Sequence, residues 1–136
     1  MIYYAVIDTN VLVSALLSSR DDAATVQVLE RVIEGEITPI YSDTIMNEYR
    51  VVLTREKFGF SDDLVQYLLF AIEKYGVLVK PSCSDVILPD MKDVPFYEVV
   101  MEKRDGDAYL VTGNIKHFPK EPFIVTPREM LDIMNG

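Results

Sequence analysis

One apolar segment near the start of the chain contains a carboxylate. The sequence YYAVIDTNVLVSALL, residues 3–17, is apolar or small almost throughout, yet Asp8 lies within it. Removing a carboxylate from water costs free energy unless the group is paired, hydrogen-bonded or bound to a metal ion. Asp8 is therefore a candidate for one of these three arrangements.

Two further carboxylates raise the same question. Glu48 is three residues after Ile45 and four before Val52, which places it beside the apolar stripe of a helix. Asp93 begins a later helix. Asp8 and Asp93 also fit as simple helix N-caps, and that alternative stays open for each of them singly. Glu48 has no such explanation, so the three together favour a metal site.

Oxygen ligands without neighbouring cysteine or histidine suit hard cations. Mg²⁺ and Mn²⁺ prefer carboxylate and water oxygens, and one or two carboxylates typically hold them together with substrate phosphates. In phosphodiester hydrolysis such ions activate a water molecule and stabilise the leaving oxygen. The residue types therefore predict metal-assisted hydrolysis with Mg²⁺ or Mn²⁺ rather than zinc.

The elements that must position these groups alternate between strand and helix. Short β-branched or aromatic runs predict five strands, over residues 2–7, 38–41, 77–79, 108–112 and 123–126. Helical patterns lie between them, one of which starts at Asp21 or Asp22 and ends at Glu34. Another carries an apolar stripe of Leu64, Leu68, Ala71, Ile72 and Tyr75. The alternation implies right-handed crossovers and a parallel sheet covered by helices on both faces.

Sites in such sheets form beyond the carboxyl ends of the strands, where the strand order reverses. The polar residues of interest all fall at that edge: Asp8, Ser42, Glu48, Asp93, Thr112 and Asn114.

Composition limits the class of protein. The 136 residues, 49% of them hydrophobic and 26% charged, suit one globular domain over residues 1–136. The single cysteine, Cys83, excludes an internal disulfide and a cysteine-rich zinc site, which fits a reducing cytoplasm. We expect a cytoplasmic protein without a membrane span. The net charge of −9 disfavours simple phosphate binding but suits carboxylates that share a cation.

Four segments resemble the successive motifs of PIN domains: VIDTNVLVSALL, YSDTIMNEYRVVLTREKF, PDMKDVPFYEVVMEK and DAYLVTGNIKHFP. The similarity covers essentially the whole chain and is strongest to the bacterial and archaeal toxin components of toxin–antitoxin systems, relatives of VapC. The resemblance implies a Rossmann-like three-layer α/β/α fold. It also implies Mg²⁺- or Mn²⁺-dependent endoribonuclease activity on RNA, a homodimer and silencing by an antitoxin protein.

The resemblance assigns roles to individual residues. Asp8, Glu48 and Asp93 match the three acidic positions, as catalytic residues and metal ligands. Asn10 and Thr112 match supporting polar residues, and Ser42 is a further supporting candidate.

Asn114 is a departure from the family pattern. Many PIN domains have aspartate in the motif TGD, where this chain reads TGN. An amide oxygen can still bind a metal ion or a metal-bound water, but one negative charge is lost. We therefore expect a weaker second ion, and the activity depends on whether Asn114 suffices. Asp90 is the reserve candidate for the missing carboxylate, with a plain surface-loop residue as its alternative.

Basic residues and the only histidine complete the candidates. His117 is interpreted as a surface or helix-end residue rather than a catalytic one. Six basic residues are candidates for a rim that meets an RNA backbone: Arg50, Arg55, Lys57, Lys92, Lys116 and Lys120.

Two other functions share some of these sequence features. A haloacid-dehalogenase-type phosphatase also has an aspartate after its first strand, but it generally uses a second one where this chain has Asn10. The alternative that stays open is a catalytically weakened PIN fold that binds RNA or protein as a regulatory module. Metal-dependent cleavage distinguishes that module from a nuclease.

Overall fold

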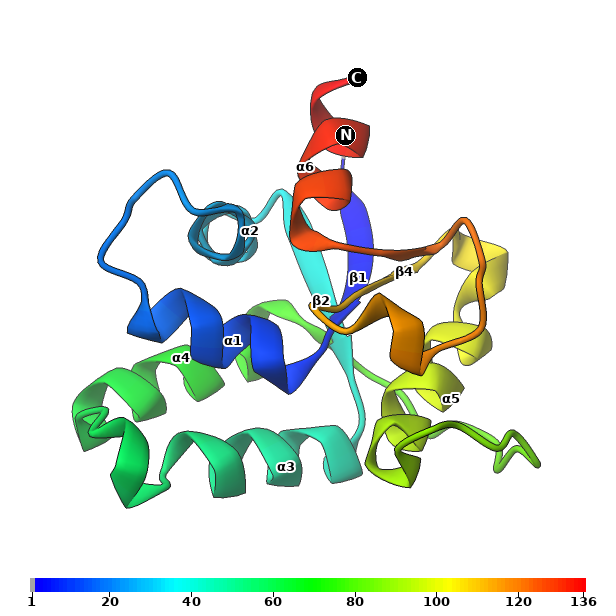
Figure 1. The fold of residues 1–136 in the computed structure, drawn as a ribbon, viewed down its shortest axis with the longest axis horizontal. Coiled ribbons are helices and arrows are strands. Elements are labelled where there is room, and N and C mark those ends of the chain that lie inside the picture. The colour runs from blue at the N-terminus through cyan, green and yellow to red at the C-terminus, as the bar shows by residue number, and fades with distance from the viewer. Residues whose placement is uncertain (1) are drawn as a thin grey trace.

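Five parallel strands form the central sheet of the computed structural model, which describes residues 2–136 (Figure 1). The strands are β1 (Tyr3–Ile7), β2 (Ile37–Tyr41), β3 (Val77–Leu78), β4 (Tyr109–Val111) and β5 (Ile124–Val125). Their spatial order is β3-β2-β1-β4-β5, and every neighbouring pair is parallel. The order therefore reverses between β1 and β4, which is where α/β sheets place their sites.

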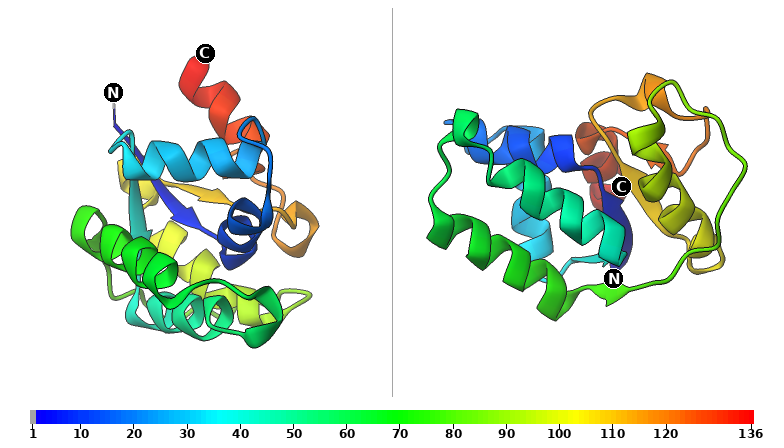
Figure 2. Two further views of the ribbon diagram at one scale, coloured as in Figure 1. Left: turned by 90° about the vertical axis from the view of Figure 1, so that its left-hand side faces the viewer. Right: turned by 90° about the horizontal axis from the view of Figure 1, so that it is seen from below.

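Helices cover both faces of the sheet, as the sequence predicted (Figure 2). On one face α2 (Ala24–Ile33) packs against β2 and α6 (Pro127–Asn135). On the other, α5 (Val94–Glu102) contacts β1, β2 and β4, and α3 (Asp43–Leu53) lies beside it. α4 (Asp62–Tyr75) contacts α3 and β2. The prediction of a Rossmann-like three-layer α/β/α domain is confirmed.

The core explains why these strands form. Ala5, Val6 and Ile7 of the central strand β1 are almost completely buried. A strand buried on both faces needs a continuous apolar run rather than an alternating one. β1 then leads directly into α1 (Thr9–Leu17), so the strand end and the helix start share Asp8 as their junction.

Helix ends follow the capping signals in the sequence. The side chains of Ser42 and Ser61 accept hydrogen bonds from the amides of Ile45 and Leu64, both at 3.2 Å. Thr126 and Glu129 form a capping box at the start of α6. Within residues 2–136, four short 3-10 helices connect the longer elements: η1 (Glu56–Phe58), η2 (Met91–Asp93), η3 (Arg104–Gly106) and η4 (Ile115–His117).

Two helix details differ from the sequence-based predictions. α2 begins at Ala24, later than Asp21 or Asp22, because Asp22 pairs with Arg20 at 3.0 Å instead of capping the helix. The buried face of α4 includes Leu68, Ala71 and Ile72 as expected, but Leu64 and Tyr75 are exposed. Val65 and Leu69 are buried instead, so the stripe that faces the core is rotated about the helix axis relative to the predicted one.

None of the helices in residues 2–136 is both long and apolar enough to span a membrane.

Candidate metal centre

Three carboxylates from separate segments meet at the carboxyl edge of the sheet. Asp8 follows β1, Glu48 lies in α3, and Asp93 precedes α5. All three line one cleft of about 350 Å³. Its other lining residues are Thr9, Asn10, Val13, Ser14, Val52, Arg55, Phe58, Asp90 and Lys92.

Asp8 is held by a hydrogen-bond network that bridges the point of strand reversal. Asp8 is only 5% exposed. Oδ2 accepts hydrogen bonds from the Thr112 hydroxyl at 2.8 Å and from the Asn10 amide at 3.3 Å. Asn10 in turn accepts one from the backbone amide of Gly113 at 3.1 Å. Two of the three residues that the sequence nominated as supporting groups, Asn10 and Thr112, therefore contact Asp8 directly.

The side chains of Asp8 and Asp93 do not cap their helices by hydrogen bonds. Asp8 and Asp93 occupy the N-cap positions of α1 and α5, but neither side chain makes a capping hydrogen bond. Asp8 bonds to Thr112 across the sheet edge, and Asp93 bonds to His117. Each carboxylate therefore lies within hydrogen-bond distance of a residue that follows β4.

Glu48 and Asp93 are each engaged by one neighbour. The Thr9 hydroxyl donates a short hydrogen bond to Oε2 of Glu48. Nδ1 of His117 lies 3.2 Å from Oδ2 of Asp93. Neither contact was predicted from the sequence. His117 does end the 3-10 helix η4 with a side chain that is 41% exposed, as predicted for a surface or helix-end residue, but it also contacts Asp93. The available signals were that Thr9 stands next to Asp8 and that His117 follows the strand-end turn after β4.

The electrostatics of the cleft reflect this crowding of negative charge. Burial, and to a smaller extent the charges of Asp93 and Glu48, raise the pKa of Asp8 from 3.8 to about 6, although the Thr112 hydrogen bond opposes the shift. Burial also raises the pKa of Asp93. Beneath the site, Tyr49 donates to the Ile7 carbonyl at 2.5 Å, and its pKa is raised by burial and then by Asp8 and Glu48.

The carboxylates fit a hard cation in their chemistry. Within residues 2–136, the side-chain hydrogen bonds of Asp8, Glu48 and Asp93 all go to one oxygen of each carboxylate. In this part of the chain the second oxygen of each carboxylate (Oδ1 of Asp8, Oε1 of Glu48 and Oδ1 of Asp93) accepts no side-chain hydrogen bond. Oxygen donors of this kind suit Mg²⁺ or Mn²⁺. No three histidine, cysteine, aspartate or glutamate side chains in the described chain are already grouped closely enough to hold an ion.

Of the remaining predicted residues, one lines the cleft and two do not. Asp90 lines the cleft, and its Oδ1 accepts a hydrogen bond from the Lys92 amide at 2.9 Å. Asn114 is exposed and not among the cleft residues, although its backbone amide donates to the Thr112 hydroxyl at 3.0 Å. Ser42 is buried as the N-cap of α3 and does not line the cleft.

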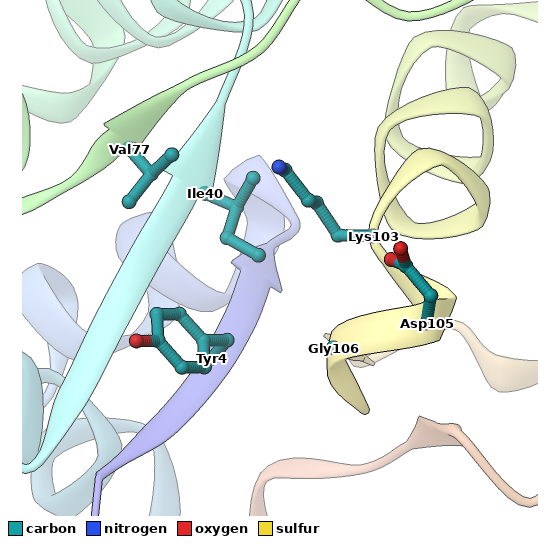
Figure 3. A pocket seen from close by; sticks show the side chains of 6 residues that line it. All are labelled: Tyr4, Ile40, Val77, Lys103, Asp105 and Gly106. Atoms are coloured by element: carbon teal, nitrogen blue, oxygen red, sulfur yellow. The ribbon is translucent and has the colours of Figure 1, made fainter.

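A second hollow, of about 460 Å³, lies away from the carboxylates (Figure 3). Tyr4, Ile40 and Val77 of the sheet form one side, and Lys103, Asp105 and Gly106 form the other. In Figure 3 the Lys103 side chain extends from the end of α5 towards Ile40. This hollow contains none of the carboxylates whose pKa is raised. The acidic cleft is therefore the better candidate for catalysis.

The fold and the cleft define an α/β protein with an acidic centre at its strand-reversal point. A family model for the PIN domain matches residues 4–116, which is most of the chain. The chain belongs to the PIN domain family, whose members are in general metal-dependent nucleases. Neither the curated proteins nor the solved structures gave a significant match.

Proposed function

We propose that this protein is a divalent-metal-dependent endoribonuclease that hydrolyses phosphodiester bonds in RNA, with Asp8, Glu48 and Asp93 as catalytic residues and metal ligands. The observation that carries the proposal is the convergence of these three carboxylates on one cleft. Burial and, to a smaller extent, the negative charges of Asp93 and Glu48 raise the pKa of Asp8, and a bound cation would offset both effects.

Each catalytic residue has a partner that orients it. Thr112 and Asn10 hold one oxygen of Asp8, Thr9 holds one oxygen of Glu48, and His117 holds one oxygen of Asp93. The other oxygens are the proposed ligands for Mg²⁺ or Mn²⁺. Such an ion, when bound, lowers the pKa of water and polarises the phosphate. Hydrogen-bonded partners of this kind restrict the carboxylates to the orientations that ligation needs.

The motif resemblance supports a more specific role, as the toxin of a toxin–antitoxin pair that acts in the cytoplasm. Cys83 is a free, exposed thiol, which suits a reducing compartment. The net charge of −9 would attract a basic antitoxin protein. Exposed aromatic residues on α4, Tyr67 at 58% and Phe70 at 63%, offer apolar surface for a homodimer or an antitoxin.

A second candidate function is a regulatory module that binds RNA or protein without cutting. Two observations favour it: Asn114 supplies no negative charge and lies outside the cleft, and the carboxylates are not already grouped around an ion position. The two candidates differ in one outcome, which is turnover.

Cleavage of a mixed pool of structured and unpaired RNA tests the proposal. The protein is incubated with Mn²⁺, with Mg²⁺ and with EDTA, and products are separated on denaturing gels. Asp93→Asn should reduce cleavage to the EDTA level, while the matched control Asp62→Asn, an exposed change in the first turn of α4, should cut like the unmodified protein. Full activity of Asp93→Asn would refute the site assignment. Binding of Mn²⁺ and RNA without any cutting would favour the regulatory module.

A further inference from the structure

The aromatic ring of Phe58 and the cations of Arg55 and Lys92 line the acidic cleft. The 3-10 helix η1 follows α3 after a short turn, and Arg55 and Phe58 from this segment line the same cleft as Asp8 and Glu48. Neither residue supports the carboxylates through a side-chain hydrogen bond within residues 2–136. They add apolar surface and positive charge to a site that is otherwise acidic.

The ring of Phe58 is fixed in position by its neighbours. Phe58 stacks on Phe60 with ring centroids 5.5 Å apart and planes 13° from parallel. Phe60 packs against the hydrophobic core, whereas Phe58 is half-buried at the cleft and outside the core cluster. Gly59 between them has a φ of 67°, a left-handed conformation that favours glycine. The turn therefore presents the Phe58 ring to the cleft rather than to the core.

One cation lies against the same ring, and two more line the cleft. Nζ of Lys57 lies 5.1 Å from the centroid of the Phe58 ring. Arg55 and Lys57 are exposed, as is Lys92 among the other cleft residues. Within residues 2–136 none of these three side chains forms an ion pair, although the protein carries a net charge of −9. The cations at this edge thus remain available to a bound anion.

We propose that Arg55, Lys57 and Phe58, which we call the η1 edge, form a subsite for an unpaired RNA strand. Phe58 stacks on one base, and Arg55 and Lys57 contact the phosphates on either side of it. Aromatic stacking combined with cations along the backbone is the usual means of holding single strands without reading sequence. A base inside a duplex has both faces covered by its neighbours, so the η1 edge selects unpaired RNA. This subsite deepens the proposed function and rests on it.

Fluorescence of 2-aminopurine tests stacking directly. Asp93→Asn protein, in which cleavage should be absent, is titrated with a short unpaired RNA that contains 2-aminopurine, and with the same strand in a duplex. Binding of the unpaired strand should quench the fluorescence. Phe58→Ala should weaken binding about 10- to 100-fold and abolish the quench, whereas Phe58→Tyr, which keeps the ring, should retain both. Phe70→Ala removes an exposed aromatic on α4 outside the cleft and should change neither.

The inference fails if Phe58→Ala binds and quenches like its parent, or if the duplex binds as tightly as the single strand. Urea unfolding of Phe58→Ala and Phe58→Tyr confirms that both are folded. Cleavage with Mn²⁺ in the Asp93-containing protein separates this inference from the proposed function. Cutting with an unchanged KM in Phe58→Ala would overturn the subsite and leave the nuclease intact. Ring-dependent binding without any cutting would support the subsite and overturn the nuclease. If neither ring-dependent binding nor cutting is seen, the subsite and the nuclease are both overturned.

Discussion

Asp8 keeps its carboxylate buried beside two others, and this arrangement has an energetic consequence that can be measured. Its pKa of about 6 in the folded protein lies above the ordinary value of 3.8. The folded protein therefore binds the proton more tightly than the unfolded chain does. Ionisation of Asp8 therefore destabilises the fold. The destabilisation is small below pH 4, where Asp8 is mostly protonated in both the folded and the unfolded state, and it grows up to about pH 6. Above that pH the full cost is about 3 kcal/mol.

Asp8→Asn should consequently stabilise the metal-free protein. In EDTA we expect its free energy of unfolding to exceed that of the unmodified protein by up to about 3 kcal/mol at pH 7.5, and by about half as much at pH 5. Urea unfolding followed by circular dichroism measures both. Asp62→Asn corrects for the loss of one charge at an exposed site. An equal gain in the free energy of unfolding at both pH values, or no gain at pH 7.5, would show that the pKa of Asp8 is not raised in the folded protein.

A substitution of Asn114 tests whether the missing fourth negative charge weakens metal binding. Its backbone amide bonds to Thr112, which in turn bonds to Asp8, so a carboxylate at this position stands next to the site. Asn114→Asp should tighten Mn²⁺ binding roughly tenfold, because a further negative charge attracts the cation. Asn135→Asp, which adds the same charge at the end of α6, is the control. Calorimetric affinities that agree for Asn114→Asp and the unmodified protein would remove Asn114 from the metal centre.

The residues that the sequence could nominate were those whose type conflicts with their surroundings. Asp8 in an apolar run and Glu48 on an apolar stripe are visible without a structure. The pairs Thr9–Glu48 and Asp93–His117 are not, since 39 and 24 positions separate their members and each residue alone has an ordinary explanation. Ser42 shows the opposite case, because its position after β2 marks both a helix cap and the site edge, and the structure shows it as the cap.

At the scale of elements, strands and helix ends followed local rules more closely than helix faces did. Ser42, Ser61 and Thr126 each begin a helix, because one side-chain oxygen satisfies one free amide of the first turn. The start of α2 could not be predicted from Asp22, because a neighbouring arginine competes for that carboxylate. The buried face of α4 depends on how α3 and the sheet approach it, which no local pattern contains.

Gly76 provides an element-scale prediction at the junction between α4 and β3. A Cβ at this position would lie 2.7 Å from the Pro39 carbonyl oxygen and closer still to that of Ile72. Gly76→Ala must therefore move backbone, and we expect it to destabilise the protein by about 1–3 kcal/mol. Gly106→Ala meets no atom within 4 Å and should be neutral or slightly stabilising. Thermal unfolding of the two variants checks this, and equal midpoints would contradict the close packing of the junction.

At the scale of the whole molecule, an acidic protein has to hold a polyanion. The net charge of −9 repels RNA at long range, so binding must depend on the few cations near the cleft. If Arg55, Lys57 and Lys92 contact phosphates, the logarithm of affinity for an unpaired strand should fall with the logarithm of salt with a slope of about −2. Arg55→Gln should make the slope shallower by about 0.7, and Lys74→Gln on α4 should not change it. Anisotropy titrations between low and moderate KCl measure the slope, and a slope near zero would exclude phosphate contacts.

The central claim is that Asp8, Glu48 and Asp93 bind a divalent cation together. Calorimetric titration of Mn²⁺ into the protein and into Asp8→Asn, Glu48→Gln, Asp93→Asn and Asp62→Asn tests it without relying on turnover. We expect the unmodified protein and Asp62→Asn to bind Mn²⁺ equally well, and each change at the three cleft carboxylates to weaken binding by about tenfold or more. Equal affinity in all five proteins would contradict the claim and leave the cleft without a metal centre.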